Sequence, residues 1–167
     1  MYFVRTALES DLKRVGTLLT ETFHATYDVF YGAAKVAELD AAWNSQAALK
    51  AMVSRPHSEF LVADDGKRLG GMAFAAMDGE SVVHLHKLYV HPNAKRQGVG
   101  RDLFAEIEGC FPAATRLRVE VEPQNTDAIA FYAAHGLEEA GRVENCGAGQ
   151  SGIPALIMEK PLTTHPL

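Results

Sequence analysis

Phosphate chemistry is favoured by the residue types and spacing of one short run, Lys95-Arg96-Gln97-Gly98-Val99-Gly100-Arg101. Gly98 and Gly100 carry no Cβ, so a ligand can approach the backbone closely at both positions. Apolar residues follow at helical spacing, which predicts that a helix begins at these glycines. The first turn of a helix offers unpaired N–H groups and a partial positive charge, and both attract phosphate. The run therefore predicts a cradle for the pyrophosphate of a nucleotide-type cofactor.

The strand predicted before this cradle changes the phase of its apolar residues. Val83 and Leu85 are apolar at odd positions, whereas Leu88 and Val90 are apolar at even positions. One extra residue near His86-Lys87 would bring both pairs to one face, as a β-bulge does. Such a bulge would bend the strand away from a parallel neighbour just ahead of the cradle. The alternative is a strand that is buried on both faces and has no bulge.

The other elements follow from apolar periodicity and turn residues. Strands are predicted at residues 2–5, 60–63, 69–77, 82–91, 116–122, 137–143 and 155–159. Helices are predicted over residues 12–23, 36–53, 99–111 and 125–135, the second in one or two pieces. The central strand-helix-strand unit requires a parallel pair with a right-handed crossover, and the hairpins require antiparallel pairs. The predicted class is α/β: a mixed, mainly antiparallel sheet of about six or seven strands, with a splayed parallel central pair and helices on both faces.

Length and composition predict one soluble globular domain over residues 1–167. The chain is 47% hydrophobic and 22% charged, which is ordinary for a globular protein. Its net charge of −5 argues against a nucleic-acid partner and is compatible with a cationic small substrate. Early charged residues argue against a signal peptide, and no apolar run reaches the length of a membrane span. Cys110 and Cys146 are too few for a disulfide framework, so we expect a cytoplasmic location.

Two motifs resemble those of the GNAT superfamily of acetyl-coenzyme-A-dependent N-acetyltransferases. The first is Leu88-Tyr89-Val90-His91-Pro92 followed by residues 95–100, similar to the family's strand and its (Arg/Gln)-x-x-Gly-x-(Gly/Ala) loop. The second is Asn125-x-x-Ala128-x-x-Phe131-Tyr132-x-x-x-Gly136-Leu137, similar to the family's Asn-x-x-Ala-x-x-Phe-Tyr-x-x-x-Gly-Phe. Lys95 stands where the family has Arg or Gln, a mild departure because the backbone makes the main contacts there. A lone Gly-x-Gly is weak, but both motifs together, in the family's order, are strong.

The resemblance implies the GNAT fold and a binding site for acetyl-coenzyme A (acetyl-CoA). The pyrophosphate is expected on the backbone of residues 97–101, and the pantetheine arm beside the strand at residues 88–90. Asn125 is expected to bond the pantetheine, and Tyr132 to lie near the sulfur. The cofactor-binding residues implied in this way are Leu88, Tyr89, Val90, Lys95, Arg96, Gln97, Gly98, Val99, Gly100, Arg101, Asn125, Ala128, Phe131 and Tyr132.

N-acetylation requires a neutral amine, a polarised thioester carbonyl and a proton for the leaving thiolate. The phenol of Tyr132 is the predicted acid, and the alternative is a core aromatic residue on a helix stripe. By resemblance, the backbone N–H of Val90 is the donor to the carbonyl oxygen.

The sequence leaves the general base open among Glu120, His84, His86 and water. Glu120 stands five residues before Asn125, a position that some family members use for the base; the alternative is a strand residue paired with Arg118 or another neighbour. His84 and His86 share a strand face, and histidine is a side-chain type that can serve as a base near neutral pH with little tuning. Their alternatives are an ordinary half-exposed pair or a metal site. No third metal ligand is visible, so no metal is expected.

The sequence identifies the acceptor site less clearly than the cofactor site. Phe23, His24, Tyr27 and Tyr31 are candidates for the wall of the acceptor cleft, and core packing between the first helices is the alternative. Three acidic residues would attract a cationic amine or simply be solvated: Asp78, Glu80 and Glu122.

Together these residues predict an N-acetyltransferase that moves an acetyl group from acetyl-CoA to a primary amine of a small molecule or peptide, by direct attack in a ternary complex. The alternative is a non-catalytic acyl-CoA-binding regulatory or sensor domain. The chain has no Gly-x-x-x-x-Gly-Lys-(Ser/Thr) run, which argues against a P-loop ATPase. A homodimer paired through the terminal strands is compatible with the resemblance. The identity of the acceptor stays open.

Overall fold

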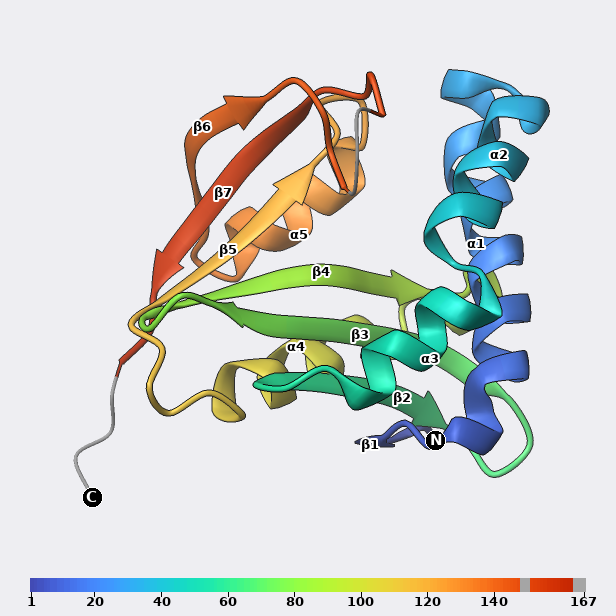
Figure 1. Cartoon of the computed structure of the whole chain (residues 1–167), viewed down its shortest axis with the longest axis horizontal. Helices are drawn as coiled ribbons and strands as arrows, with labels where there is room; N and C mark the ends of the chain where they lie inside the picture. The colour runs from blue at the N-terminus through green and yellow to red at the C-terminus, as the bar shows by residue number, and fades with distance from the viewer. Residues whose placement is uncertain (148–150, 164–167) are drawn as a thin grey trace. The chain divides into compact units, whose positions relative to one another are not determined.

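A computed structural model describes residues 1–147 and 151–163, which include a seven-stranded mixed sheet of order β1-β2-β3-β4-β5-β7-β6 (Figure 1). The strands are β1 (Phe3–Thr6), β2 (Ser58–Asp64), β3 (Leu69–Asp78), β4 (Val82–Val90), β5 (Arg116–Val121), β6 (Glu138–Val143) and β7 (Ala155–Pro161). The β4–β5 pair is parallel, and the β1–β2, β5–β7 and β6–β7 pairs are antiparallel. The predicted mixed sheet with a parallel central pair is confirmed.

The helices follow the predicted segments closely. They are α1 (Leu12–Tyr31), α2 (Ala33–Trp43), α3 (Gln46–Ser54), α4 (Val99–Gly109) and α5 (Thr126–Ala134), with short 3-10 helices η1 (Glu9–Asp11) and η2 (Pro92–Ala94). The first helix continues past its predicted end because the following aromatic residues keep the helical stripe, and it stops at Gly32, which has a φ of 80°. The second helical region forms two helices, since the hydroxyl of Ser45 caps α3 by accepting the N–H of Ala48 at 3.1 Å.

The chain forms two compact units, and β3 and β4 each run through both. The N-terminal unit holds Met1–Ala75 and Lys87–Cys110, and the C-terminal unit holds Ala76–His86 and Phe111–Leu167. A single domain over residues 1–167 stays a prediction.

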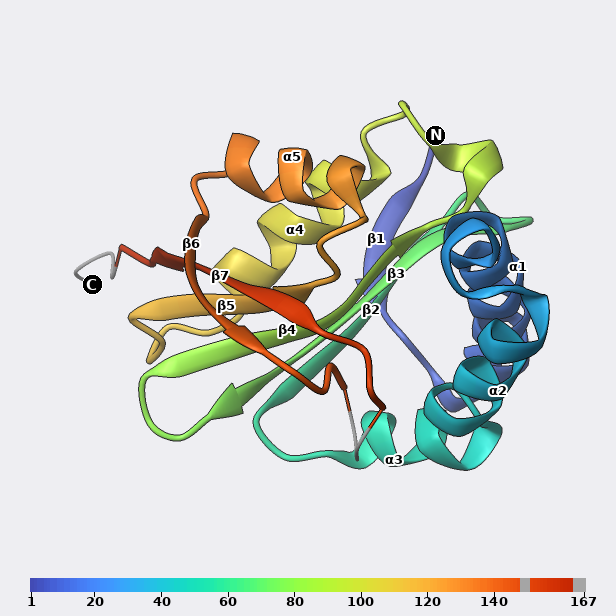
Figure 2. The same ribbon diagram turned by 90° about the horizontal axis from the view of Figure 1, so that it is seen from above.

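In the N-terminal unit the sheet is covered on both faces. The residues from Phe60 to Ala63 on β2 and from Leu69 to Ala75 on β3 are buried without alternation. This pattern is typical of strands with cover on both sides. Figure 2 shows α4 on one side of these strands and α1 to α3 on the other, which confirms helices on both faces for this unit.

In the C-terminal unit the alternation predicted for β5 is present, with Leu117, Val119 and Val121 buried. A register shift between Glu139 and Gly141 marks an irregularity in the β6–β7 pair that the sequence did not predict. The bulge predicted near His86-Lys87 stays a prediction. Part of the predicted glycine-rich connection between the last two strands, residues 148–150, lies outside the described residues. Within the described part of the chain, no helix combines the length and apolar character needed to cross a membrane.

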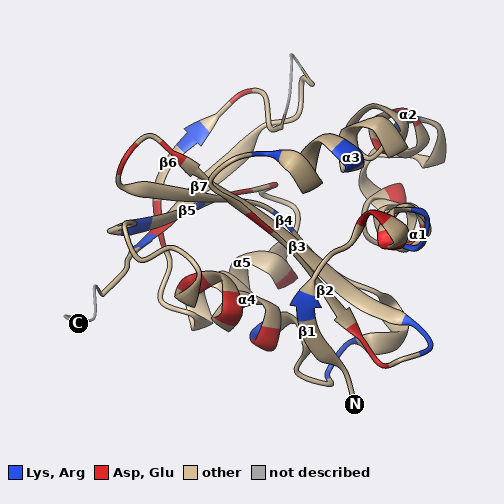
Figure 3. Ribbon diagram, turned by 60° about the horizontal axis from the view of Figure 1, so that its bottom comes forward, with Lys and Arg blue, Asp and Glu red and all other residues tan. Residues whose placement is uncertain are grey.

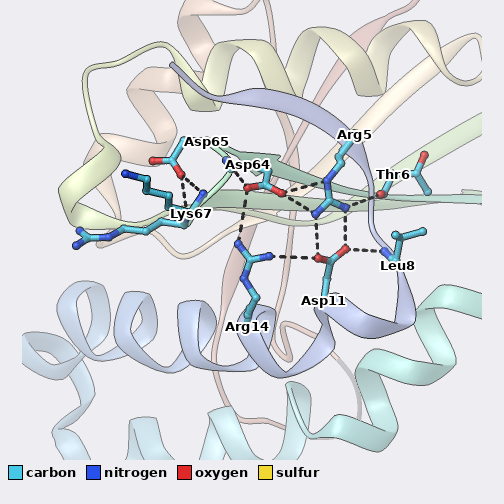
Figure 4. Close-up of polar contacts among 10 residues, drawn as sticks. Arg5, Thr6, Leu8, Asp11, Arg14, Asp64, Asp65 and Lys67 are labelled. Atoms are coloured by element: carbon cyan, nitrogen blue, oxygen red, sulfur yellow. Dashed lines mark hydrogen bonds and ion pairs between the residues drawn. The ribbon is translucent and has the colours of Figure 1, made fainter.

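An ion-pair network fastens the start of α1 to the first two strands (Figure 4). The guanidinium of Arg5 donates to the two carboxylate oxygens of Asp11 at 2.7 and 2.9 Å and to Asp64 at 2.8 Å. Arg14 adds longer contacts to both carboxylates. Asp11 is 4% exposed and also accepts the N–H of Leu8. The hydrogen bonds from Arg5 hold the pKa values of Asp11 and Asp64 below their usual range.

Arg5→Met is expected to lower the free energy of unfolding at neutral pH by about 1–2 kcal/mol, because it leaves the buried Asp11 carboxylate with the N–H of Leu8 and the more distant cation of Arg14. This loss of unfolding free energy is small because the Arg5 side chain is 35% exposed and its charge is therefore screened by solvent. Urea denaturation measures it, with the exposed Arg142→Met as the matched control.

The same network predicts a sign for the pH dependence of stability. Asp11 and Asp64 have folded pKa values below their unfolded ones, so their contribution is present above about pH 5 and is lost as the pH falls below about 4. Urea titrations from neutral pH down to about pH 2.5 are therefore expected to show a shallower fall in Arg5→Met than in the parent chain. Equal slopes would show that the acid sensitivity lies elsewhere.

Candidate cofactor and catalytic site

The predicted phosphate cradle is a turn that enters α4 through two left-handed residues. Gly98 is the N-cap residue, with φ 79° and ψ 4°, and Arg96 has a φ of 63°. Glycine adopts this conformation without strain, whereas arginine adopts it rarely. Residues in such strained backbone conformations are often found at binding sites. The amide of Gln97 donates to the carbonyl of Asn93 at 3.1 Å and holds the turn. The first bond of the helix runs from the N–H of Asp102 to the carbonyl of Gly98, so the earlier N–H groups are left for an anion.

The same turn is the cationic end of α4. Lys95, Arg96 and Arg101 are exposed, and the acidic residues of the helix begin at Asp102 (Figure 3). The guanidinium of Arg101 pairs with Asp102 at 3.1 Å. Left-handed backbone, a helix N-terminus and three exposed cations together fit a diphosphate group.

Close packing at Gly71 sets the distance of α4 from β3. A Cβ at this position would lie 2.8 Å from the carbonyl oxygen of Tyr89, 2.9 Å from Val99 and 3.1 Å from Leu103. Val99 and Leu103 belong to the buried stripe that the sequence predicted for this helix. The missing side chain of Gly71 therefore lets both α4 and the end of β4 approach β3.

The end of β4, Leu88 to Val90, is half-buried along its length. The ring of Tyr89 contacts the ring of Phe23 on α1, with 5.0 Å between the centroids. This strand end leads directly to the cradle, as the sequence predicted.

His91, which the sequence analysis left outside the site, joins this strand end to other elements. Its side chain is only 20% exposed, and its Nε2 lies 2.7 Å from the carboxylate of Glu21 on α1. Its Nδ1 accepts the N–H of Asn93 at 3.2 Å and so caps η2. Sequence reasoning missed the contact between His91 and Glu21 because the two residues are 70 positions apart in the chain.

In the C-terminal unit, Asn125 and not Thr126 caps α5, since the Oδ1 of Asn125 accepts the N–H of Ala128 at 3.2 Å. Tyr132 is 6% exposed, and its ring meets that of Phe131 edge-on at 5.4 Å. Burial, with a further contribution from the carboxylate of Glu122, raises the pKa of Tyr132 well above that of an ordinary tyrosine. The phenol therefore keeps its proton at neutral pH, as a general acid must.

Glu122 is buried, which rules out the solvated alternative for this residue. The side chain is 8% exposed, although it follows Arg118 and Glu120 on the polar face of the β5 pattern. Alternation reports which face a residue takes and not what covers that face, so no signal in the sequence separated Glu122 from Glu120. A buried carboxylate is costly unless it is paired or hydrogen-bonded.

The two histidines proposed as bases lie on one strand face. The rings of His84 and His86 stack with their centroids 4.1 Å apart and their planes at 21°. His84 stands opposite Arg118 in the parallel β4–β5 register, so the pair shares its face with Arg118 and Glu120.

Glu120 is half-buried, and its carboxylate accepts the N–H of Gly147 at 3.4 Å. In the part of the chain that the structure describes, Arg118 pairs with Glu159 on β7 at 2.8 Å, so of the two alternatives for Glu120 the contact with another neighbour is the one observed. Hydrogen bonds from Arg118 and Arg116 lower the pKa of Glu159. Arg116 and Arg118 are thus engaged by Glu159, whereas Glu120 accepts the long contact from the N–H of Gly147.

The acceptor-cleft candidates divide by exposure. Phe23 is 1% exposed and Tyr27 6% exposed, and their rings contact each other at 5.5 Å, so both have the core packing named as the alternative. His24 and Tyr31 are half-exposed, and the Nδ1 of His24 lies 2.7 Å from the carboxylate of Asp28.

The described residues offer neither a metal-binding cluster nor a reactive thiol at Cys110. Over residues 1–147 and 151–163, no group of three or more His, Cys, Asp and Glu side chains is arranged to hold a metal ion. Cys110 and Cys146 are free, and burial raises the pKa of Cys110 to about 11, so this thiol is protonated at neutral pH.

Each unit thus holds part of the predicted site. The cradle, the end of β4 and α1 belong to the N-terminal unit, whereas Asn125, Tyr132 and the base candidates belong to the C-terminal unit.

The fold is that of a mixed α/β protein in which the turn before α4 fits a phosphate group. Residues 17–137 match the Acetyltransferase (GNAT) family, and the chain belongs to this family, as the two motifs predicted. The donor that this family uses is acetyl-CoA.

Named relatives agree with the assignment. The peptidyl-lysine N-acetyltransferase YjaB of Salmonella typhimurium is 32% identical over 83 residues, which are 50% of this chain and 51% of the relative. The chain therefore matches about half the length of that curated relative.

Solved structures share the fold. The PaiA N-acetyltransferase of Thermoplasma acidophilum, in complex with coenzyme A, has a TM-score of 0.84 at 21% identity, over 96% of this chain and 99% of the other. The apo-form of YjaB from Escherichia coli has a TM-score of 0.68 at 23% identity, over 99% of both chains. At these identities the likeness establishes the fold alone.

Proposed function

We propose that the chain transfers the acetyl group of acetyl-CoA to a primary amine of a peptide or small molecule, by direct attack in a ternary complex. One observation carries the proposal: a left-handed turn at Gly98, with a cationic rim, opens α4 directly after β4. This arrangement fits a pyrophosphate, and membership of the family supplies the identity of the donor.

The residues proposed to hold the donor are those that the motifs named. The N–H groups of residues 97–101 neutralise the pyrophosphate, and the peptide groups of Leu88 to Val90 pair with the pantetheine arm as an added strand would. Asn125 and Tyr132, with Ala128 and Phe131, line the pantetheine side. When bound, acetyl-CoA supplies a thioester with an electrophilic carbonyl carbon. The N–H of Val90 is proposed to donate to the thioester carbonyl oxygen and to stabilise the charge that develops there.

Two side chains of the C-terminal unit are proposed to move protons. Glu120 takes the proton of the attacking amine, directly or through water, and Tyr132 gives its phenol proton to the departing sulfur. The buried position and raised pKa of Tyr132 support its role, because the proton remains available at the working pH. His84 and His86 remain the competing bases.

A lysine side chain in a peptide is the first acceptor to test, because the relative that matches half of this chain is described as a peptidyl-lysine N-acetyltransferase. Small amines, including amino acids, polyamines and aminoglycosides, form the second group. A cytoplasmic location and a homodimer stay proposals, the first supported by two free cysteines and a composition without a disulfide framework.

Release of free thiol from acetyl-CoA, measured with a lysine peptide and with the small amines in turn, tests the proposed transfer. Turnover with at least one amine and formation of the acetylated amine, seen by mass spectrometry, would support it. Tight binding of acetyl-CoA with no turnover on any amine would favour the acyl-CoA sensor instead. Tighter binding of ATP or a dinucleotide than of coenzyme A would remove both.

Glu120→Gln is expected to lower kcat/KM for the amine by about 10–100-fold at neutral pH, because the amide cannot take the amine proton. The defect should shrink as the pH rises and more of the amine is already neutral. His84→Gln and His86→Gln are the matched comparisons, and each should change kcat/KM by less than about threefold. A larger loss in either histidine variant than in Glu120→Gln would transfer the role of base to that histidine.

A further inference from the structure

Three alternate residues at the end of β4 each contact the α1–α2 segment. The Nζ of Lys87 donates to the Oδ1 of Asn44, which follows α2, at 2.6 Å. The ring of Tyr89 meets Phe23, and the Nε2 of His91 lies 2.7 Å from Glu21. Alternate residues of an extended chain point to the same face, so these contacts form one row that fastens α1 and α2 to the strand.

Behind Lys87 the polar contacts continue through the helices. Asn44 is 6% exposed, and its amide nitrogen donates to one carboxylate oxygen of Asp40 at 2.9 Å. The hydroxyl of Thr20 donates to the other oxygen of Asp40 at 2.6 Å. The chain of hydrogen bonds therefore runs from β4 through α2 to α1. Because Asn44 is buried, its amide oxygen would remain desolvated and unpaired if the bond from Lys87 were lost, and that loss would cost free energy.

His91 makes the corresponding link on the other side of Tyr89. Its Nδ1 accepts the N–H of Asn93, which assigns the ring proton to Nε2 and makes Nε2 the donor to Glu21. Its own peptide N–H donates to the carbonyl of Gly70 on β3 at 2.8 Å. One residue thus joins α1, β3 and the start of the turn that leads to the cradle.

We infer that Lys87 and His91 are positioning residues for acetyl transfer. They stand immediately before and after Leu88 to Val90, and they hold α1 and the end of α2 in register with that strand segment. The half-exposed acceptor-cleft candidates His24 and Tyr31 lie on α1. The inference rests on the proposed function, which assigns the donor to this segment. Neither side chain is assigned a contact with the reacting atoms. A displacement of about 1 Å between reactants can cost up to about 100-fold in rate, so two fixed links on either side of the donor segment are well placed to matter.

The test at Lys87 compares Lys87→Met, Asn44→Leu and the double variant. Each single variant is expected to lower kcat/KM for the acceptor amine by about tenfold, with the Kd for coenzyme A within about twofold of the parent value. The double variant is expected to be no worse than the poorer single one, because both changes remove the same link. Lys87→Arg should recover part of the loss, since it keeps a donor to Asn44. Lys50→Met, on an exposed lysine of α3, is the matched control.

The test at His91 uses its partner, because Glu21 is largely exposed and its replacement disturbs the core little. Glu21→Leu is expected to lower acceptor kcat/KM by about threefold to tenfold, and Glu21→Gln, which keeps an oxygen acceptor for Nε2, should recover most of it.

Two results would overturn the positioning role of Lys87 and His91. Additive losses at Lys87 and Asn44, with Lys87→Met far the worse, would mean that Lys87 meets the acceptor itself and would overturn the positioning role. A lower melting temperature with unchanged kinetics would overturn it also, since the links would then serve only the fold. If the parent protein is active and none of the variants changes its kinetics, this inference alone is wrong. If the parent protein binds coenzyme A but acetylates no amine, both this inference and the proposed function are wrong.

Discussion

Tyr132→Phe is expected to lower kcat for acetyl transfer by about 100-fold and to leave the Kd for coenzyme A within about twofold of the parent value. Phenylalanine keeps the volume of a side chain that is 6% exposed, so the packing around α5 is retained and only the hydroxyl is lost. A factor of 100 corresponds to about 2.7 kcal/mol of barrier, within the range that one positioned acid contributes.

The pH dependence of kcat tests the raised pKa of Tyr132. Burial and the carboxylate of Glu122 raise the pKa of Tyr132, so its phenol is expected to stay protonated through the whole assay range. The parent kcat should therefore show no descending limb near pH 10, where an ordinary tyrosine ionises. A limb near that pH that disappears in Tyr132→Phe would contradict the raised pKa.

Tyr2→Phe is the matched control, because it removes a hydroxyl from a half-buried tyrosine that no part of the proposed site uses. Its kcat is expected to stay within about twofold of the parent value, as for a surface change. Parent-like kcat in Tyr132→Phe, with coenzyme A still bound, would remove Tyr132 as the acid and leave it a core residue.

The elements most faithfully predicted from sequence were those whose signal is local. The apolar stripe of α4, the alternation of β5 and the cap at Asn125 each depend on a few neighbouring residues, and each is present in the structure. The end of α1 was missed because its aromatic residues suit both a helix and a strand, and only packing decides between them. The irregularity between Glu139 and Gly141 comes from pairing with β7, a partner that no local pattern identifies.

The site divides in the same way. The cradle was predicted because a glycine turn, its cations and the helix that follows are contiguous in the chain. The burial of Glu122 and the contact of His91 with Glu21 were not, because each is created by segments far apart in sequence. Both features bear on the proposed mechanism. The burial of Tyr132 raises the pKa of its phenol, and the carboxylate of Glu122 adds to that effect. The contact of His91 with Glu21 fastens α1 beside the segment that is proposed to hold the donor.

Gly100→Glu is expected to raise the Kd for coenzyme A by at least about 100-fold without harming the fold. Gly100 is the second residue of α4, in the first turn that is proposed to bind the pyrophosphate. A side chain there fills space beside the backbone N–H groups, and its carboxylate repels a diphosphate. For the fold the same change is favourable, because glycine is a poor helix former and an acidic residue suits the first turn. The melting temperature is therefore expected to hold or rise while binding is lost.

Calorimetry with coenzyme A on three variants separates the causes of that loss. Gly100→Ala adds only a Cβ and is expected to cost less than about tenfold, so the remainder in Gly100→Glu belongs to the longer side chain and its charge. Ala105→Glu adds the same charge to an exposed position in the middle of α4 and should leave the Kd within about twofold. Because a helix N-terminus acts on anions over no more than its first turn, a weak effect at residue 105 and a strong one at residue 100 would locate the diphosphate at the cradle. An unchanged Kd in a folded Gly100→Glu protein would mean that the diphosphate binds elsewhere.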